Sequence, residues 1–193
     1  MEDGISLIDV SLSFGAVGVF SGFSASFPKG SRTCVTGPSG CGKTSLLRMV
    51  LGLLAPDGGR VSVPKGWKAS AVFQEDRLLA GFHGVYNVRL VCPKGISDRA
   101  IEDALYQVGI PRESWYLPVR QLSGGMARRT AIVRAVLAEG ELLVMDEPFK
   151  GLDPVNREKT VNFVMENLRG RTLIAATHEP QDVELLRAEL LRL

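Results

Sequence analysis

The sequence predicts an α/β fold built on a mostly parallel sheet, and three observations support this. Apolar runs alternate along the chain with segments of helical periodicity, which is typical of parallel strands joined by crossover helices. The run 142–145 is entirely apolar, as expected for a strand covered on both faces. A glycine-rich loop at 37–44 lies between a strand pattern and a helical pattern. These features together favour a doubly wound sheet with a loop at one strand end.

The elements are expected in the following order. Residues 1–30 indicate short antiparallel strands with tight turns, which form a separate small sheet. Ser97 can cap a helix that runs to Gln107, and Gly109 can end it. Apolar residues at 183, 186, 190 and 193 form a helical stripe that predicts a C-terminal helix docked on the core. The remaining elements are a helix at 43–54 and strands at 32–36, 70–74, 141–146 and 172–177. We expect one domain over 1–193, with a helical subdomain inserted at approximately 75–138.

Bulk properties restrict the function only loosely. The 193 residues are 45% hydrophobic, which is enough for one well-packed core. The net charge of +2 gives no basic field of the kind that binds nucleic acid. The longest apolar tract, 46–55, contains Arg48 and is shorter than the roughly 20 residues that cross a bilayer. An acidic start and three cysteines without metal-ligand spacing favour the reducing cytosol. Any role at a membrane is therefore expected to depend on a partner.

The glycine-rich loop fits the pattern G-x-x-x-x-G-K-[ST], which predicts a nucleotide phosphate site. Backbone N–H groups at a helix N-terminus wrap the phosphate oxygens, and the helix dipole favours their negative charge. Lys43 would neutralise the terminal phosphates, while the Thr44 hydroxyl would bind Mg²⁺. Cys41 is interpreted as a small filler, and Ser45 as one further phosphate contact. The expected phosphate-binding residues are Gly37, Pro38, Ser39, Gly40, Cys41, Gly42, Lys43, Thr44 and Ser45.

Two carboxylates, Asp146 and Glu147, follow the apolar run 142–145. They would lie at the carboxyl end of a buried strand, where doubly wound sheets bind ligands. Asp146 is expected to hold Mg²⁺ through water, and Glu147 to orient or deprotonate an attacking water. The alternative is an ordinary acidic junction between a strand and a loop. A lone Asp would indicate binding, whereas the adjacent Glu indicates hydrolysis.

Seven elements in this order resemble the ABC-type (ATP-binding cassette) ATPases over essentially the whole chain: Phe14, the loop 37–44, Gln74, 122–125, 142–147, 151–153 and His178. The resemblance implies a P-loop NTPase (RecA-like) core, a small antiparallel β subdomain and an α-helical subdomain. It implies that Phe14 stacks on adenine, although plain core packing is the alternative for an aromatic there. It also implies that Gln74 ligates Mg²⁺ and senses the membrane partner. His178 would contact the terminal phosphate, and Asp153 would lie at the contact between cassettes.

Ser123, Gly124 and Gly125 are expected to open a helix whose free N–H groups form a second phosphate site. In the family this end completes the nucleotide site of another cassette. The implied assembly is a head-to-tail homodimer that buries two ATP molecules. The chain departs from the family at Met126, where Gln is usual, and at Lys150, where a small residue is common.

The resemblance implies an ATP-binding and ATP-hydrolysing subunit that dimerises on ATP and powers a membrane transporter. The stretch 73–79 is similar to that of importers of the nitrate, sulfonate and taurine group, which favours import of a small solute such as an anion. Implied partners are membrane permease subunits and an extracytoplasmic solute-binding protein, with no nucleic acid. The implied location is cytoplasmic, peripheral on the inner face of the cell membrane.

Two other functions compete with this interpretation. A soluble ABC-type ATPase would act on DNA, ribosomes or iron-sulfur assembly, but the chain has no long coiled-coil insertion and no second cassette. A P-loop small-molecule kinase would leave Ser123 and His178 without a purpose. The arginines around the 123–137 helix pattern are interpreted as a solvated helix face and not as a nucleic-acid surface: Arg120, Arg128, Arg129 and Arg134.

Overall fold

The computed structural model describes residues 3–193, which form two compact units. The first, here called the sheet unit, contains the chain up to Ala69 together with Glu141–Asp146 and Gly170–Leu193. The second, here called the helical unit, contains Ser70–Gly140 and Glu147–Arg169. The chain therefore passes from the first unit to the second between Asp146 and Glu147.

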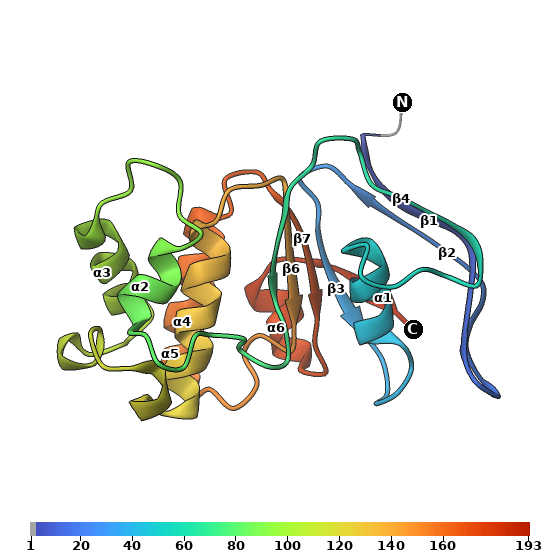
Figure 1. Cartoon of the computed structure of the whole chain (residues 1–193). Coiled ribbons are helices and arrows are strands. Elements are labelled where there is room, and N and C mark those ends of the chain that lie inside the picture. Colours follow the sequence, from blue (N-terminus) through green and yellow to red (C-terminus); the bar gives the residue numbers. More distant parts are fainter. Residues whose placement is uncertain (1–2) are drawn as a thin grey trace. The chain divides into compact units, whose positions relative to one another are not determined.

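A parallel sheet forms the centre of the sheet unit. The strands are β3 (Arg32–Thr36), β6 (Leu142–Asp146), β7 (Thr172–Ala176) and β8 (Glu189–Arg192), and with β5 (Ala69–Val72) they give the order β5-β6-β7-β3-β8. Thr33 pairs with Ile174 of β7 and with Glu189 of β8, both in parallel register. Every residue of β6 and β7 is buried, which explains why these two sequences are nearly continuous apolar runs. Figure 1 shows β6, β7 and β3 side by side, with α1 (Lys43–Val50) after β3.

A separate antiparallel sheet completes this unit, in the order β2-β1-β4. Its strands are β1 (Gly4–Phe14), β2 (Val17–Pro28) and β4 (Gly58–Ser62). The expectation of a small antiparallel sheet is confirmed, but β1 and β2 are 11 and 12 residues long and not short. The register of β1 with β2 shifts between Leu7 and Val10, so an irregular pairing lets one long hairpin bend. The expected α/β fold class, with parallel sheet, antiparallel sheet and helices, is thus confirmed.

The C-terminal expectation was wrong. Helix α6 (Pro180–Leu185) is followed by Arg187 with φ 48°, a left-handed conformation that ends the helix. The chain then turns into β8, where Leu190 pairs with Cys34 and Leu191 with Val35. The apparent helical stripe at 183–193 arose because helix and strand each contribute part of it. Helix α1 also ends at Val50, four residues before the expected end, and Gly52 follows with φ 68°.

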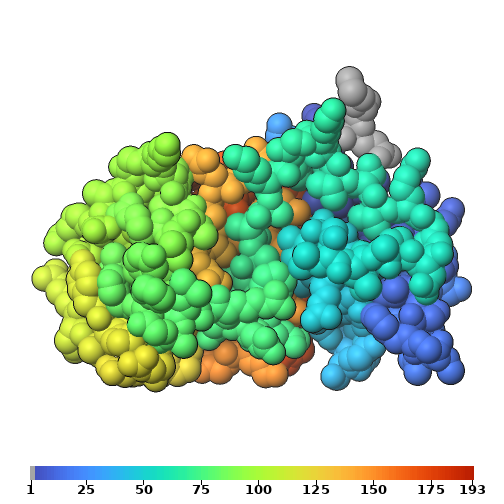
Figure 2. Space-filling view, viewed as in Figure 1, coloured from blue at the N-terminus to red at the C-terminus, as the bar shows by residue number. Residues whose placement is uncertain are grey.

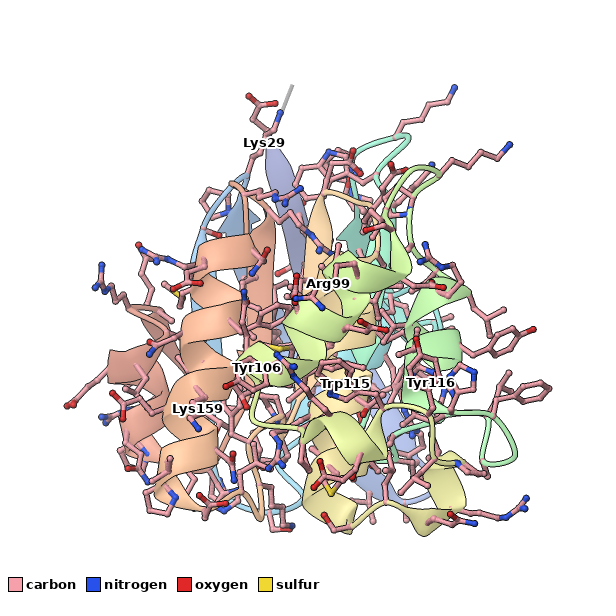
Figure 3. All side chains as sticks on the ribbon, turned by 90° about the vertical axis from the view of Figure 1, so that its left-hand side faces the viewer. Lys29, Arg99, Tyr106, Trp115, Tyr116 and Lys159 are labelled. Carbon is pink, nitrogen blue, oxygen red and sulfur yellow. The ribbon has the colours of Figure 1, made fainter. Side chains whose placement is uncertain are left out.

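The helical unit is built around α4 (Gly124–Leu137), which packs against α2 (Gly84–Arg89), α3 (Asp98–Gln107) and α5 (Pro154–Asn167). The predicted cap of α3 is confirmed, since the Ser97 hydroxyl accepts from the N–H of Ala100. Trp115 is buried, and its indole N–H donates to the carbonyl of Ile110 at 3.0 Å. Figure 3 shows Tyr106, Trp115 and Tyr116 following one another across this unit. Figure 2 shows segments from about residue 80 to 120, green to yellow, at its surface.

Asn87 of α2 fixes the loop that precedes this helix. Its side chain accepts from the N–H of Leu79 at 2.7 Å and donates to carbonyls of Leu79, Phe82 and His83. The residue is 1% exposed, so its amide forms these hydrogen bonds away from bulk water.

We expect Asn87→Ala to lower the free energy of unfolding by about 2 kcal/mol, because the hydrogen bonds between the buried amide and the 79–83 loop are lost. The exposed Asn162→Ala on α5 is the matched control, with an expected change within about 0.5 kcal/mol. Urea unfolding followed by circular dichroism measures both. Equal stability of the two variants would contradict a structural role for the Asn87 amide.

Candidate nucleotide site

The phosphate loop occupies residues 37–42 between β3 and α1. Gly42 caps α1 with φ 104°, a conformation that side-chain-bearing residues rarely adopt. A Cβ at Gly42 would meet Val19 Cγ1 at 2.6 Å and Phe20 Cζ at 2.7 Å, so β2 packs directly on the loop backbone. The first turn of α1 contains no acidic residue, which leaves its N–H groups and dipole available to an anion.

We expect Gly42→Ala to strain the loop, because the left-handed backbone and two close contacts both oppose a methyl group. The expected loss is about 2 kcal/mol in the free energy of unfolding, with weaker ATP binding. The matched control is Gly40→Ala, where φ is also positive at 82° but no atom lies within 4 Å of the added Cβ. Thermal unfolding and ATP titration of both variants check this. If the two variants lose equal stability, packing against β2 is not the cause.

Lys43 is the first residue of α1, and its side chain is hydrogen-bonded to the backbone of the phosphate loop. Its ammonium donates to the carbonyls of Gly37 and Pro38, both at 2.9 Å. The Cys41 sulfur lies 3.9 Å from the same nitrogen. A lysine ammonium is a compact charge with three donors, so one face of it bonds the loop while another can meet phosphate oxygens. The position fits the role expected of Lys43.

Thr44 and Asp146 come together at the end of β6. The Thr44 hydroxyl donates to Asp146 Oδ2 at 2.8 Å, and Asp146 is 5% exposed. A hydroxyl oxygen and a carboxylate oxygen are hard donors of the type that Mg²⁺ prefers, and Mg²⁺ also keeps several waters. The pair therefore fits a magnesium ion that is shared with a phosphate.

His178 follows β7, and its side chain is 47% exposed with Nε2 at 3.3 Å from Glu179 Oε1. The preceding Thr177 is buried and donates its hydroxyl to Asp182 Oδ2 at 2.5 Å. The Glu179 N–H donates to the Thr177 hydroxyl, which fixes the backbone on both sides of the histidine. Phe14, at the end of β1, is 53% exposed. The structure therefore excludes plain core packing as the account of Phe14.

A pocket of about 340 Å³ lies within the helical unit. Gln74 and Glu147 both line it, as does Gly124 at the start of α4. The other lining residues are Asp76, Arg128 and Lys150. Glu147 has φ 49°, a left-handed conformation that is costly for a residue with a side chain. The expected water-activating carboxylate and the expected glutamine thus share one hollow.

The start of α4 has the geometry expected of a second anion site. Ser123 is the N-cap, and its hydroxyl accepts from the N–H of Met126 at 3.2 Å. Ser123 and Gly124 are exposed, so the positive end of the 14-residue helix faces solvent. Asp153 caps α5 and accepts two bonds from Asn156, which hold the pKa of this carboxyl below its usual range.

The candidate residues are divided between the two units. Phe14, Lys43, Thr44, Asp146 and His178 belong to the sheet unit, together with the whole phosphate loop. The helical unit contains Gln74, Ser123, Gly124, Gly125, Glu147 and Asp153. Consecutive residues, Asp146 and Glu147, link the two sets through one peptide bond.

A protein-family model described as ABC transporter matches residues 20–150, which include the phosphate loop, Ser123 and both carboxylates. The chain belongs to the ABC transporter family. This placement agrees with the resemblance found in the sequence. The match covers more than half of the chain, and it ends before His178.

Two curated relatives in this family are import proteins. The chain is 38% identical over 177 residues to "Aliphatic sulfonates import ATP-binding protein SsuB 3" of Rhodococcus jostii, covering 91% of this chain and 62% of the relative. It is 34% identical over 180 residues to "Thiamine import ATP-binding protein ThiQ" of a Chelativorans species, covering 85% of this chain and 73% of the relative. The matched region is thus less than two thirds of the length of the sulfonate protein.

A solved structure supports the fold. The dimeric structure of a bacterial ABC transporter cassette superposes with a TM-score of 0.83 at 22% identity, covering 98% of this chain and 94% of that one. At this identity the likeness concerns the fold alone. Within residues 3–193, no helix of this family member is long and apolar enough to cross a membrane.

The interpretation of the four arginines as a solvated face was wrong for the three on α4, whereas Arg120 is exposed as expected. Arg128 and Arg129 are 7% and 6% exposed, and Arg134 is only half-buried. Arg128 and Arg134 donate to backbone carbonyls of other segments, and Arg129 to the carbonyl of Gly109 at 3.4 Å. Burial lowers the pKa of Arg129 and of Arg134. The one feature of the sequence that could have indicated this buried role is the position of these arginines on α4, the helix that Ser123 caps.

Proposed function

We propose that this chain is the ATP-binding and ATP-hydrolysing subunit of a membrane importer for a small solute such as an anion. The observation that supports it most strongly is the bond between the Thr44 hydroxyl and Asp146 Oδ2, beside the glycine loop and Lys43. The hydroxyl and the carboxylate suit Mg²⁺, and the nearby ammonium suits the phosphates. Binding of a magnesium nucleoside triphosphate requires these three groups. Family membership and the two import relatives support the transport role.

In this proposal the phosphate loop and Ser45 bind the phosphates, and Lys43 neutralises their charge. Thr44, Asp146 and Gln74 would hold Mg²⁺, which when bound spreads the charge developing on the phosphate oxygens. Glu147 accepts a proton from the attacking water, or orients it, and His178 donates to the terminal phosphate. Phe14 supplies an exposed aromatic face for the adenine base.

We extend the proposal to a head-to-tail homodimer that forms on ATP. Its support is the exposed N-terminus of α4, which offers Ser123, Gly124 and Gly125 to an anion. Asp153, exposed at the cap of α5, would lie at the contact between the copies. The remaining partners are permease subunits and an extracytoplasmic solute-binding protein, with the chain cytoplasmic on the inner face of the membrane.

The test is mild-detergent capture of Glu147→Gln with ATP from the source cell, followed by identification of the co-purifying proteins. We expect a multi-helix permease, together with an extracytoplasmic binding protein. Capture of Lys43→Ala under the same conditions is the control, since it should lose the ATP-dependent part of the yield. Recovery of ribosomes, DNA or soluble proteins alone would overturn the transport role.

A further inference from the structure

Arg128 of α4 bonds the segment that carries Gln74. Its Nη1 donates to the carbonyl of Phe73, and it lies 3.5 Å from the carbonyl of Gln74. The same nitrogen is 3.1 Å from Asp76 Oδ1, so an ion pair accompanies the carbonyl bonds. The side chain is 8% exposed, which protects these bonds from competition by water.

The same guanidinium also bonds the segment that carries the other proposed catalytic group. Nη2 donates to the carbonyl of Glu147 at 2.7 Å, and Nε donates to the carbonyl of Pro148 at 3.0 Å. A guanidinium is planar and holds its N–H donors in a fixed fork. One side chain therefore sets the spacing between the backbone at 73–74 and the backbone at 147–148.

The bond from Arg128 to the Glu147 carbonyl stabilises an unfavourable backbone conformation. The φ of 49° at Glu147 is disfavoured for a side-chain-bearing residue, so the surroundings must hold it in place. The bond from Arg128 Nη2 acts on the carbonyl of that same residue. Rotation of this peptide would redirect the Glu147 side chain in the pocket that it lines with Gln74.

We propose that Arg128 is a positioning residue for ATP hydrolysis, which fixes Glu147 and Gln74 relative to each other and ties both to α4. This inference rests on the proposed function. Because Ser123 caps α4, any displacement of the exposed end of α4 reaches the backbone of Glu147 through Arg128. Arg128 acts through Glu147 and contributes no proton, since a guanidinium is not deprotonated in proteins.

Arg134 provides a matched comparison on the same helix. It donates to the carbonyls of Asp76 at 2.9 Å and Arg77 at 2.7 Å, so within residues 3–193 its hydrogen bonds reach only the first of the two segments. It is also partly buried and lies on the same helix. A difference between variants of Arg128 and Arg134 therefore reports the bonds to Glu147 and Pro148.

The first experiment measures amide hydrogen exchange in the full chain, independently of activity. In Arg128→Gln we expect faster exchange in peptides that cover 73–77 and in those that cover 147–150. In Arg134→Gln we expect faster exchange in the first region only. Unchanged exchange at 147–150 in Arg128→Gln overturns the proposal, whether or not the chain hydrolyses ATP.

The second experiment measures steady-state phosphate release. For Arg128→Gln we expect kcat to fall roughly 10- to 100-fold, the scale of a misplaced catalytic group, with KM for ATP within about threefold. Arg128→Lys should recover part of kcat, because an ammonium can bond one segment, and Arg134→Gln should stay within about threefold of the parent. A parallel loss in Arg134→Gln, or a rise in KM alone, overturns the positioning role. A parent chain without turnover contradicts the proposed function instead.

Discussion

Replacement of Glu147 by Gln is expected to lower ATP turnover roughly 100-fold or more, the scale of general base catalysis. The amide is close in size to the carboxylate, so the left-handed turn at this residue and the pocket around it should persist. It cannot accept a proton from the attacking water, however. ATP binding should survive, because Lys43 and the phosphate loop are unchanged.

The measurement is phosphate release at saturating ATP, with ATP binding determined in parallel by calorimetry. Glu158→Gln on α5 is the matched control, since it removes an exposed carboxylate of the same helical unit. Size-exclusion chromatography with ATP adds a second readout, because trapped ATP should enrich the proposed homodimer. Turnover of Glu147→Gln within about threefold of the parent would show that another group activates the water.

Replacement of Lys43 by Ala is expected to weaken ATP binding roughly 100-fold, the scale of losing one partner of a close, hydrogen-bonded charge pair. The ammonium bonds the carbonyls of Gly37 and Pro38, so the variant loses both a phosphate partner and a loop contact. Turnover at limiting ATP should fall at least as far.

Calorimetric titration with ATP and Mg²⁺ measures this effect, and circular dichroism confirms folding. Arg48→Ala is the control, because Arg48 is an exposed cation on the same helix α1. If both variants lose the same affinity, the effect is one of net charge and not of the Lys43 position. A salt titration separates the two causes further, since diffuse charge effects are screened.

Local patterns in the sequence were sufficient to predict much of this fold. The strands β6 and β7 could be found because each is a short, buried, mostly apolar run, and β3 because it leads directly into the glycine-rich loop. The caps Ser97 and Ser123 could be found because a hydroxyl at a helix start has one dominant use. Such signals depend on a few neighbouring residues, so tertiary contacts do not alter them.

Other features depend on contacts between distant segments. Arg128 resembles a surface arginine because its carbonyl acceptors, at 73–74 and 147–148, carry no mark in the sequence. Asn87 was missed for the same reason, since it bonds backbone groups of the 79–83 loop. The C-terminal error arose because β8 is defined by its pairing with β3 and not by its own pattern.

The position of β8 affects how this protein should be handled in the laboratory. It is an edge strand, and the N–H of its following residue, Leu193, donates to the carbonyl of Thr36 at 2.9 Å. A Cβ on Gly37 would lie 2.9 Å from the Leu193 carbonyl, so any peptide fused after Leu193 emerges beside the phosphate loop. An affinity tag fused there would compete with nucleotide for space. Expression vectors for binding and turnover assays should therefore place the tag ahead of β1.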